Sequence, residues 1–176
     1  MNLKTGDLTN LVVQGYPPSH RTILAFIAGH LDGNIRYLLL NTWKNKDGDV
    51  KDSYHTKLRS SKFCLCLSEV ASPRIVEAIF AECVPMLISD SYVPPFSDVL
   101  NWKLFSVQID VKEIPNIKKI LMGISERQYL KMQRRVKQVQ RHFVPHEPPK
   151  RFDVFHMTIH SIWLRRLNIR IRDDVQ

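Results

Sequence analysis

Two short apolar runs, separated by one amphipathic segment, dominate the hydrophobic pattern of the chain. Residues 63–67 and 84–88 are continuous nonpolar runs, which is typical of strands buried on both faces. Between them, Ser72-Pro73 is a helix start signal, and apolar residues then recur at helical spacing: Ile75, Val76, Ile79, Phe80 and Cys83. This pattern predicts two parallel strands joined by a right-handed crossover helix.

A second unit of the same kind precedes the first. Residues 22–28 form a largely apolar run, and Gly29 follows it directly, ahead of a predicted helix with an apolar face of Ile35, Leu38 and Leu39. A glycine at such a turn lets a ligand phosphate approach the helix N-terminus. Residues 104–109 resemble a fourth strand, whereas the polar segment 45–53 does not supply the strand that a regular alternation would need there.

The last third of the chain is predicted to be helical. Ser125 and Gln128 form a capping-box pattern, and apolar residues then repeat every three or four positions: Tyr129, Met132, Val136, Val139 and Phe143. After three prolines, a last amphipathic helix is predicted with an apolar face of Phe152, Phe155, Ile159, Ile162, Trp163 and Leu167.

These elements predict an α/β fold with a mostly parallel, Rossmann-like sheet flanked by helices. We divide the chain into an N-terminal linker at 1–21, a Rossmann-like domain at 22–124, and C-terminal helices at 125–176 that pack on the same domain. A length of 176 residues with 44% hydrophobic content fits one sizeable core.

Charge and cysteine content narrow the function classes. The formal net charge of +9 favours anionic partners, such as phosphorylated small molecules, nucleic acid or membrane surfaces. No apolar run is long enough to span a membrane, and no nucleic-acid recognition motif is present. We therefore expect no membrane span in this chain and no nucleic-acid partner. Cys64 and Cys66 lie two apart on one predicted strand, where a bond between them would be strained, so we expect the three cysteines to be buried thiols without a metal.

Polar residues between the two buried strands suggest a binding site. Ser68, Glu69 and Ser72 follow the first strand, at the carboxyl end of the sheet, where such folds bind ligands. Glu77 comes eight positions after Glu69, and both carboxylates can face this edge and accept hydrogen bonds from two ribose or sugar hydroxyls. An equally good interpretation is that Glu77 only pairs with a nearby Arg or Lys.

Several long segments resemble the C-terminal half of the plant exostosin-like glycosyltransferases. They are VVQGYPPSHRTILAFIAG, EVASPRIVEAIFAECVPMLISDSYVPPFSDVLNW, RVKQVQRHF and FDVFHMTIHSIWLRRL. The resemblance implies the C-terminal lobe of a two-lobed, GT-B type enzyme, which binds a nucleotide-sugar donor while the other lobe binds a glycan acceptor. It also implies a protein of the Golgi membrane or lumen that builds cell-wall polysaccharide, with a uridine diphosphate sugar as donor and no cofactor.

The resemblance also assigns residues to the donor site. Glu69 and Glu77 match the family's paired glutamates, and Ser68, Ser72 and Arg74 lie in the same motif. Arg36, in the helix after Gly29, matches a position expected to neutralise the donor diphosphate, which suits a guanidinium. The alternative for Arg36 is a solvated helix residue.

Three departures from the family pattern bear on activity. From the resemblance, we expect the loop before Glu69 to be two residues shorter than in typical members, a strand to be missing near residues 45–53, and the acceptor lobe with its membrane anchor to be absent. We therefore expect a truncated donor-binding half that does not transfer sugar to polysaccharide alone. The competing hypothesis is a non-catalytic remnant that acts as a protein-interaction module, with a full-length family member as its partner.

Overall fold

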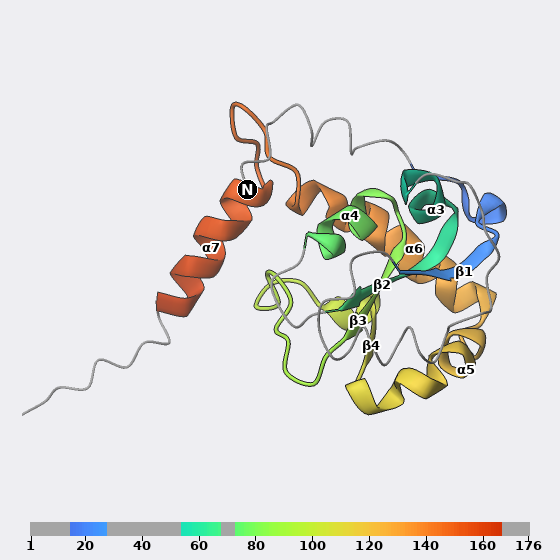
Figure 1. Cartoon of the computed structure of the whole chain (residues 1–176). Coiled ribbons are helices and arrows are strands. Elements are labelled where there is room, and N and C mark those ends of the chain that lie inside the picture. The colour runs from blue at the N-terminus through green and yellow to red at the C-terminus, as the bar shows by residue number, and fades with distance from the viewer. Residues whose placement is uncertain (1–14, 28–53, 68–72, 167–176) are drawn as a thin grey trace, which may run out of the picture.

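A parallel four-stranded sheet lies at the centre of the computed structural model, which describes residues 15–27, 54–67 and 73–166 (Figure 1). The strands follow one another in chain order across the sheet: β1 (Ile23–Phe26), β2 (Ser61–Leu67), β3 (Val84–Ile88) and β4 (Val107–Ile109). All neighbours are parallel, with Phe63 opposite Val84 and Met86 opposite Val107. Helices flank the sheet, so the predicted α/β, Rossmann-like fold class is confirmed.

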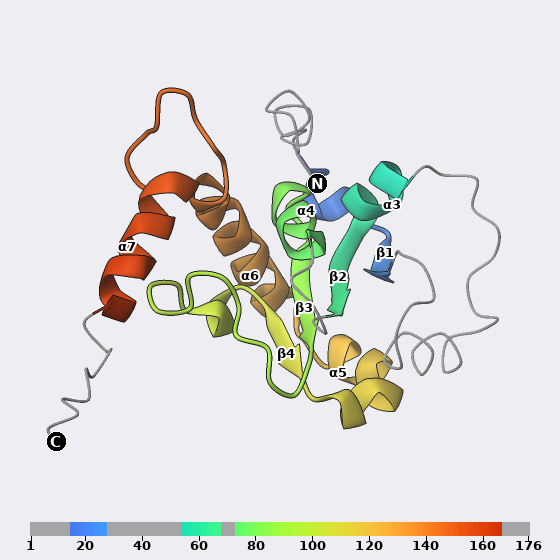
Figure 2. The same cartoon turned by 60° about the vertical axis from the view of Figure 1, so that its left-hand side comes forward.

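The structure describes five helices around this sheet. They are α3 (Tyr54–Ser60), α4 (Arg74–Phe80), α5 (Ile117–Met122), α6 (Glu126–Val139) and α7 (Val154–Arg166). Short 3-10 turns lie at Pro18–His20, Trp102–Leu104, Val111–Asn116 and Gln140–His142. Helix α4 is the predicted crossover between β2 and β3, and α6 runs past both α4 and β3 (Figure 2).

Buried apolar residues from the sheet and α6 form the core. Strand β3 is buried along its whole length, which confirms the prediction for residues 84–88. The capping box of Ser125 and Gln128 is present at the start of α6, and Tyr129 and Val136 face the core as predicted. Strand β4 is shorter than the predicted run at 104–109, because the Trp102 carbonyl accepts from the backbone N–H groups of Phe105 and Ser106 and holds a turn there.

A disulfide between Cys64 and Cys83 corrects the prediction of three free thiols. Cys64 lies on β2, and Cys83 immediately precedes β3. The register pairs Phe63 with Val84, so Cys64 and Cys83 are diagonal neighbours where β2 and β3 run side by side, with Cα atoms 5.8 Å apart. Cys66 is a buried thiol outside the disulfide, as expected, and burial raises its pKa to about 12.

Arg21 anchors the segment before β1 to the body of the protein. Its side chain is buried and donates hydrogen bonds to the carbonyl oxygens of Tyr16 at 2.9 Å, Ser61 at 2.8 Å and Ala81 at 2.8 Å. Gly15 approaches the same place so closely that a Cβ there would collide with the Ala81 carbonyl oxygen and the Arg21 guanidinium. The described part of the predicted linker is therefore packed against the fold.

Helix α7 presents to solvent the face that was predicted to be its apolar, inward side. Phe155, Ile159, Ile162 and Trp163 are each more than half exposed. The opposite side meets the body instead, through buried Met157 and through Ser161, whose hydroxyl donates to the Asp98 carboxylate at 3.1 Å. Figure 1 shows α7 standing beside the sheet and its covering helices. The helix is apolar on two sides, so the sequence pattern alone did not identify which side packs.

Asp153 fixes the start of α7. Its carboxylate accepts from the backbone N–H groups of His156 at 3.1 Å and Lys150 at 2.8 Å. Burial of Asp153 raises the pKa of its carboxyl group, but these donors outweigh that effect and hold the pKa at about 2.

Throughout 15–27, 54–67 and 73–166, no helix has the length and apolar character needed to cross a membrane.

Candidate functional site

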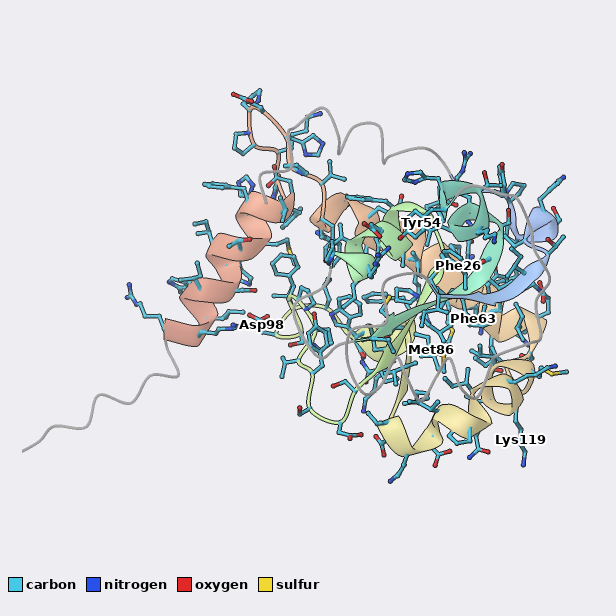
Figure 3. All side chains as sticks on the ribbon, in the orientation of Figure 1. Phe26, Tyr54, Phe63, Met86, Asp98 and Lys119 are labelled. Atoms are coloured by element: carbon cyan, nitrogen blue, oxygen red, sulfur yellow. A yellow bond between two sulfur atoms is a disulfide. The ribbon has the colours of Figure 1, made fainter. Side chains whose placement is uncertain are left out.

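The carboxyl ends of all four strands meet at one edge of the sheet. Strand β1 ends there at Phe26 and β2 at Leu67, because the strands are parallel. Helix α4 begins at this edge, after β2 has ended. Helix α3 leads directly into the start of β2, so its first residue, Tyr54, also lies toward the carboxyl edge. The Tyr54 ring accordingly lies 5.7 Å from the ring of Phe26 (Figure 3).

Tyr54, Arg74 and Glu77 form a cluster of polar side chains at this edge. The Tyr54 hydroxyl donates a hydrogen bond to Oε2 of Glu77. Arg74 donates from Nη1 to the Tyr54 hydroxyl at 2.6 Å and lies 3.4 Å from Oε2 of Glu77. The side chains of Arg74 and Glu77 are 30% and 23% exposed, so the cluster is packed against the protein but is still accessible to a ligand.

Burial and the neighbouring carboxylate keep the Tyr54 phenol protonated. Burial, followed by the hydrogen bond to Glu77, raises the pKa of Tyr54 to about 12. At neutral pH the hydroxyl therefore retains the proton that it donates to Glu77. It accepts from Arg74 at the same time, which is within the capacity of a phenol oxygen.

The structure describes two of the seven predicted site residues, and it brings these two together. Arg74 and Glu77 lie one turn apart on α4 and form the ion pair that was the alternative interpretation of Glu77. Pairing does not exclude ligand binding, because a carboxylate has about four acceptor positions. The other five predictions lie outside the described residues: Gly29, Arg36, Ser68, Glu69 and Ser72.

Comparison with known protein families assigns this chain to one of them. Residues 10–124, more than half of the chain, match the model of the exostosin GT47 domain. This chain belongs to the exostosin GT47 family of glycosyltransferases. The resemblance predicted from the sequence motifs is thereby confirmed.

Similar plant proteins agree with the family assignment. The chain is 57% identical to Probable glycosyltransferase At5g03795 of Arabidopsis thaliana, over 98% of this chain and 35% of that protein. It is 54% identical to Probable glycosyltransferase At3g07620 of the same plant, over 97% of this chain and 38% of that protein. Probable beta-1,4-xylosyltransferase IRX10L of Arabidopsis thaliana is 30% identical over 68% of this chain and 32% of its own length. The chain thus spans about a third of the length of these GT47 relatives.

Tyr54 is the member of the exostosin-domain cluster that sequence reasoning missed. It is the first residue of α3, and the sequence motifs assign it no role. One signal was available: a helix that leads straight into a buried parallel strand must begin near the carboxyl edge. A tyrosine at that position is therefore a candidate for contact with residues that follow the next strand.

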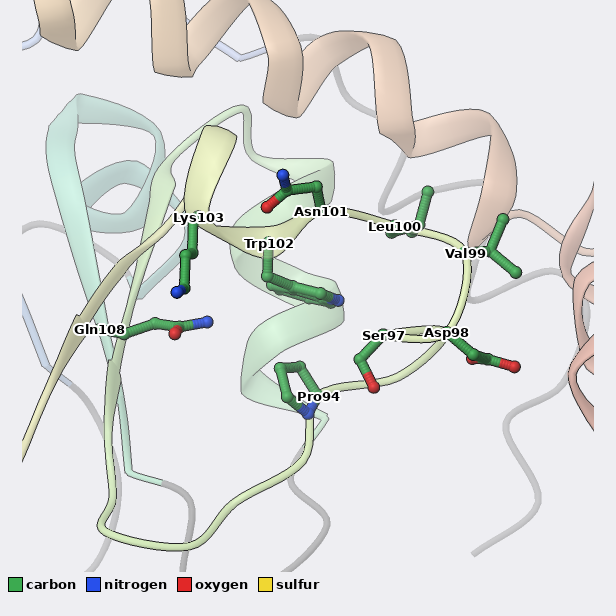
Figure 4. A pocket seen from close by; sticks show the side chains of 9 residues that line it. All are labelled: Pro94, Ser97, Asp98, Val99, Leu100, Asn101, Trp102, Lys103 and Gln108. Carbon is green, nitrogen blue, oxygen red and sulfur yellow. The ribbon is translucent and has the colours of Figure 1, made fainter. Parts of the chain in front are cut away.

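A concave surface of the exostosin domain is lined by neither Arg74 nor Glu77, the two predicted site residues that the structure describes. It is a shallow pocket of about 340 Å³ between residues 94–103 and β4 (Figure 4). Polar side chains at its rim include Asp98, Asn101, Lys103 and Gln108. The Trp102 indole is 3% exposed and donates to the Pro95 carbonyl at 2.8 Å, so it supports the loop and offers little ring surface for stacking.

Proposed function

We propose that this chain is the donor-binding half of an exostosin-type glycosyltransferase. In this proposal a nucleotide sugar, with uridine diphosphate as its nucleotide part, binds at the carboxyl edge of the sheet. The observation that carries the proposal is the Tyr54, Arg74 and Glu77 cluster, which lies at this edge in a chain of the GT47 family. Parallel α/β sheets bind nucleotides at this edge.

Each residue has a defined task in this proposal. Glu77 and Glu69 accept hydrogen bonds from hydroxyl groups of the donor, with Glu77 on the ribose. Gly29 allows the diphosphate to approach a helix N-terminus, and the Arg36 guanidinium offsets its charge. Ser68, Ser72 and Arg74 complete the wall of the site, and no cofactor takes part.

The proposed chemistry needs an acceptor as well as a donor. The acceptor hydroxyl oxygen forms a bond to the anomeric carbon of the sugar and loses its proton. The bond from that carbon to the diphosphate breaks, and the nucleoside diphosphate leaves with the electron pair. Negative charge develops on the departing phosphate, which is where fixed cationic groups stabilise the transition state. The acceptor in this proposal is a cell-wall polysaccharide or another glycan.

The disulfide supports a location in the secretory pathway. Cys64 of β2 is joined to Cys83, the residue before β3, and both are buried in the core. Such bonds persist in oxidising compartments and are rare where cellular thiols stay reduced. We therefore propose the Golgi lumen as the compartment, in agreement with a role in polysaccharide synthesis.

A second candidate function is a protein-interaction module without transferase activity. The exposed apolar face of α7 favours it, since Phe155, Ile159, Ile162 and Trp163 form a nonpolar surface on one side of the helix. A full-length family member is the partner in that proposal.

Titration with uridine diphosphate by calorimetry tests the donor site. We expect the wild type to bind, and we expect Glu77→Ala to weaken binding by about 10-fold to 100-fold, the range for a hydrogen bond to a charged group. Glu126→Ala is a matched control, because Glu126 is exposed and pairs with Lys62 near the start of β2, at the opposite edge of the sheet.

Two results would count against the proposal. Equal affinity of the wild type and Glu77→Ala would remove Glu77 from the site. No binding of uridine diphosphate by the wild type would contradict the donor-binding function itself and leave the interaction module as the better account.

A further inference from the structure

We infer that Tyr54 is a positioning residue of the donor site, which holds the Glu77 carboxylate in the orientation that meets the ribose hydroxyls. This inference rests on the proposed donor-binding function. It adds a residue from α3, twenty-three positions before Glu77, to a site that the sequence motifs confined to other segments.

The Tyr54 ring is held by groups from two other elements. On one side lies Phe26 of β1, with ring centroids 5.7 Å apart and a tilt of 53° between the planes. The guanidinium of Arg74, from α4, lies over the Tyr54 ring at 5.2 Å from its centroid. Contacts with a strand and a helix restrict the side-chain rotation of Tyr54. The hydroxyl is therefore presented at a defined place on the carboxyl edge.

The Tyr54 hydroxyl connects the two charged members of the cluster. It donates to Oε2 of Glu77 and accepts from Nη1 of Arg74 at 2.6 Å. The direct contact of Arg74 with Glu77 is longer, at 3.4 Å. The closer polar contacts in the cluster therefore run through Tyr54, and the phenol provides the main restraint on the carboxylate.

The arrangement leaves acceptor positions of Glu77 for a ligand. Within the described part of the chain, the contacts of the carboxylate with Tyr54 and Arg74 are both made by Oε2. A carboxylate with one oxygen fixed cannot rotate freely about its last torsion, so the two acceptor positions of Oε1 keep fixed directions. Such pre-organisation lowers the entropy cost of accepting two neighbouring hydroxyls.

The inference predicts that the effect of Tyr54 on binding depends on Glu77 and on the ribose hydroxyls. We expect Tyr54→Phe, which keeps the ring and removes the hydroxyl, to weaken uridine diphosphate binding about 3-fold to 10-fold. This is less than the effect of Glu77→Ala, because the carboxylate remains and loses only part of its restraint. In a Glu77→Ala background the same change should alter affinity less than about 2-fold, since residues that act through one another are not additive.

A nucleotide without the ribose hydroxyls separates positioning from general stability. Calorimetry would compare uridine diphosphate with its 2′,3′-dideoxy analogue on each variant, with Glu126→Ala as the control. We expect Tyr54→Phe to reduce the preference for the ribose form, whereas a purely structural effect would weaken both nucleotides equally. Because the preference is a ratio measured on one variant, a lower melting temperature of Tyr54→Phe does not affect the test.

Each outcome has a definite meaning. Reduced preference together with non-additivity supports the inference. Unchanged preference, or additive effects of Tyr54→Phe and Glu77→Ala, overturns the inference while donor binding by the wild type stands. Absence of uridine diphosphate binding by the wild type overturns the proposed function and this inference together.

Discussion

Replacing Cys64 and Cys83 together by alanine is expected to lower the free energy of unfolding by about 3 kcal/mol. Their disulfide joins residues 19 positions apart in the sequence. Closing a loop of that size restricts the unfolded chain by roughly this amount in the chain-entropy account. The bond also lies in the core, since Cys64 is 3% exposed and Cys83 is fully buried. Chemical denaturation followed by circular dichroism measures the change.

Reductant provides the matched control for this variant. A reducing agent should lower the stability of the wild type toward that of the double variant, and it should leave the double variant unchanged. Cys66→Ala tests for simple loss of packing, because Cys66 is equally buried but is not part of a disulfide. Identical denaturation midpoints for the oxidised wild type and the double variant would contradict a stabilising disulfide.

Replacing Arg21 by methionine is expected to lower the free energy of unfolding by about 3 kcal/mol or more. The guanidinium is 2% exposed and donates to three carbonyl oxygens, of which those of Ser61 and Ala81 belong to buried contacts. Methionine would fill part of the space, but each buried carbonyl that loses its donor costs about 1–3 kcal/mol. Burial lowers the pKa of the Arg21 guanidinium from its ordinary value, whereas nearby Tyr129 and Glu82 raise it.

An exposed arginine gives the comparison for Arg21. Arg134→Met, on the solvent side of α6, should change stability by less than about 0.5 kcal/mol. Arg21→Lys should fall between the two, because lysine keeps the charge but not the planar set of donors. A wild-type denaturation midpoint for Arg21→Met would show that the three hydrogen bonds do not support the fold.

The central elements could be predicted from sequence because their signals are local. The apolar runs at 63–67 and 84–88 are buried strands, and the structure extends only the first of them, to Ser61–Leu67. The capping box at Ser125 likewise depends on residues three positions apart. Each of these patterns is complete within a short stretch of chain, so tertiary packing did not alter it.

Features that depend on tertiary packing could not be predicted in the same way. The Cys64–Cys83 bond follows from the register of two strands, and sequence spacing had drawn attention to Cys66 instead. The packed side of α7 follows from where Met157 meets the body. Among site residues, Tyr54 of α3 contacts Glu77 of α4 only because both helices pack beside β2 in the folded protein. The roles of Gly29, Arg36, Ser68, Glu69 and Ser72 stay predictions, as do the domain boundaries.

The location of bound nucleotide tests the donor-site account most directly. Uridine diphosphate would be titrated into the isotope-labelled chain, and backbone amide shifts would be followed by nuclear magnetic resonance. The account predicts the largest shifts at the carboxyl edge, at Tyr54, Arg74 and Glu77, with little change near Lys62 at the opposite edge. Shifts confined to the pocket at residues 94–103, or their absence throughout the chain, would contradict a nucleotide-sugar site at the edge of this sheet.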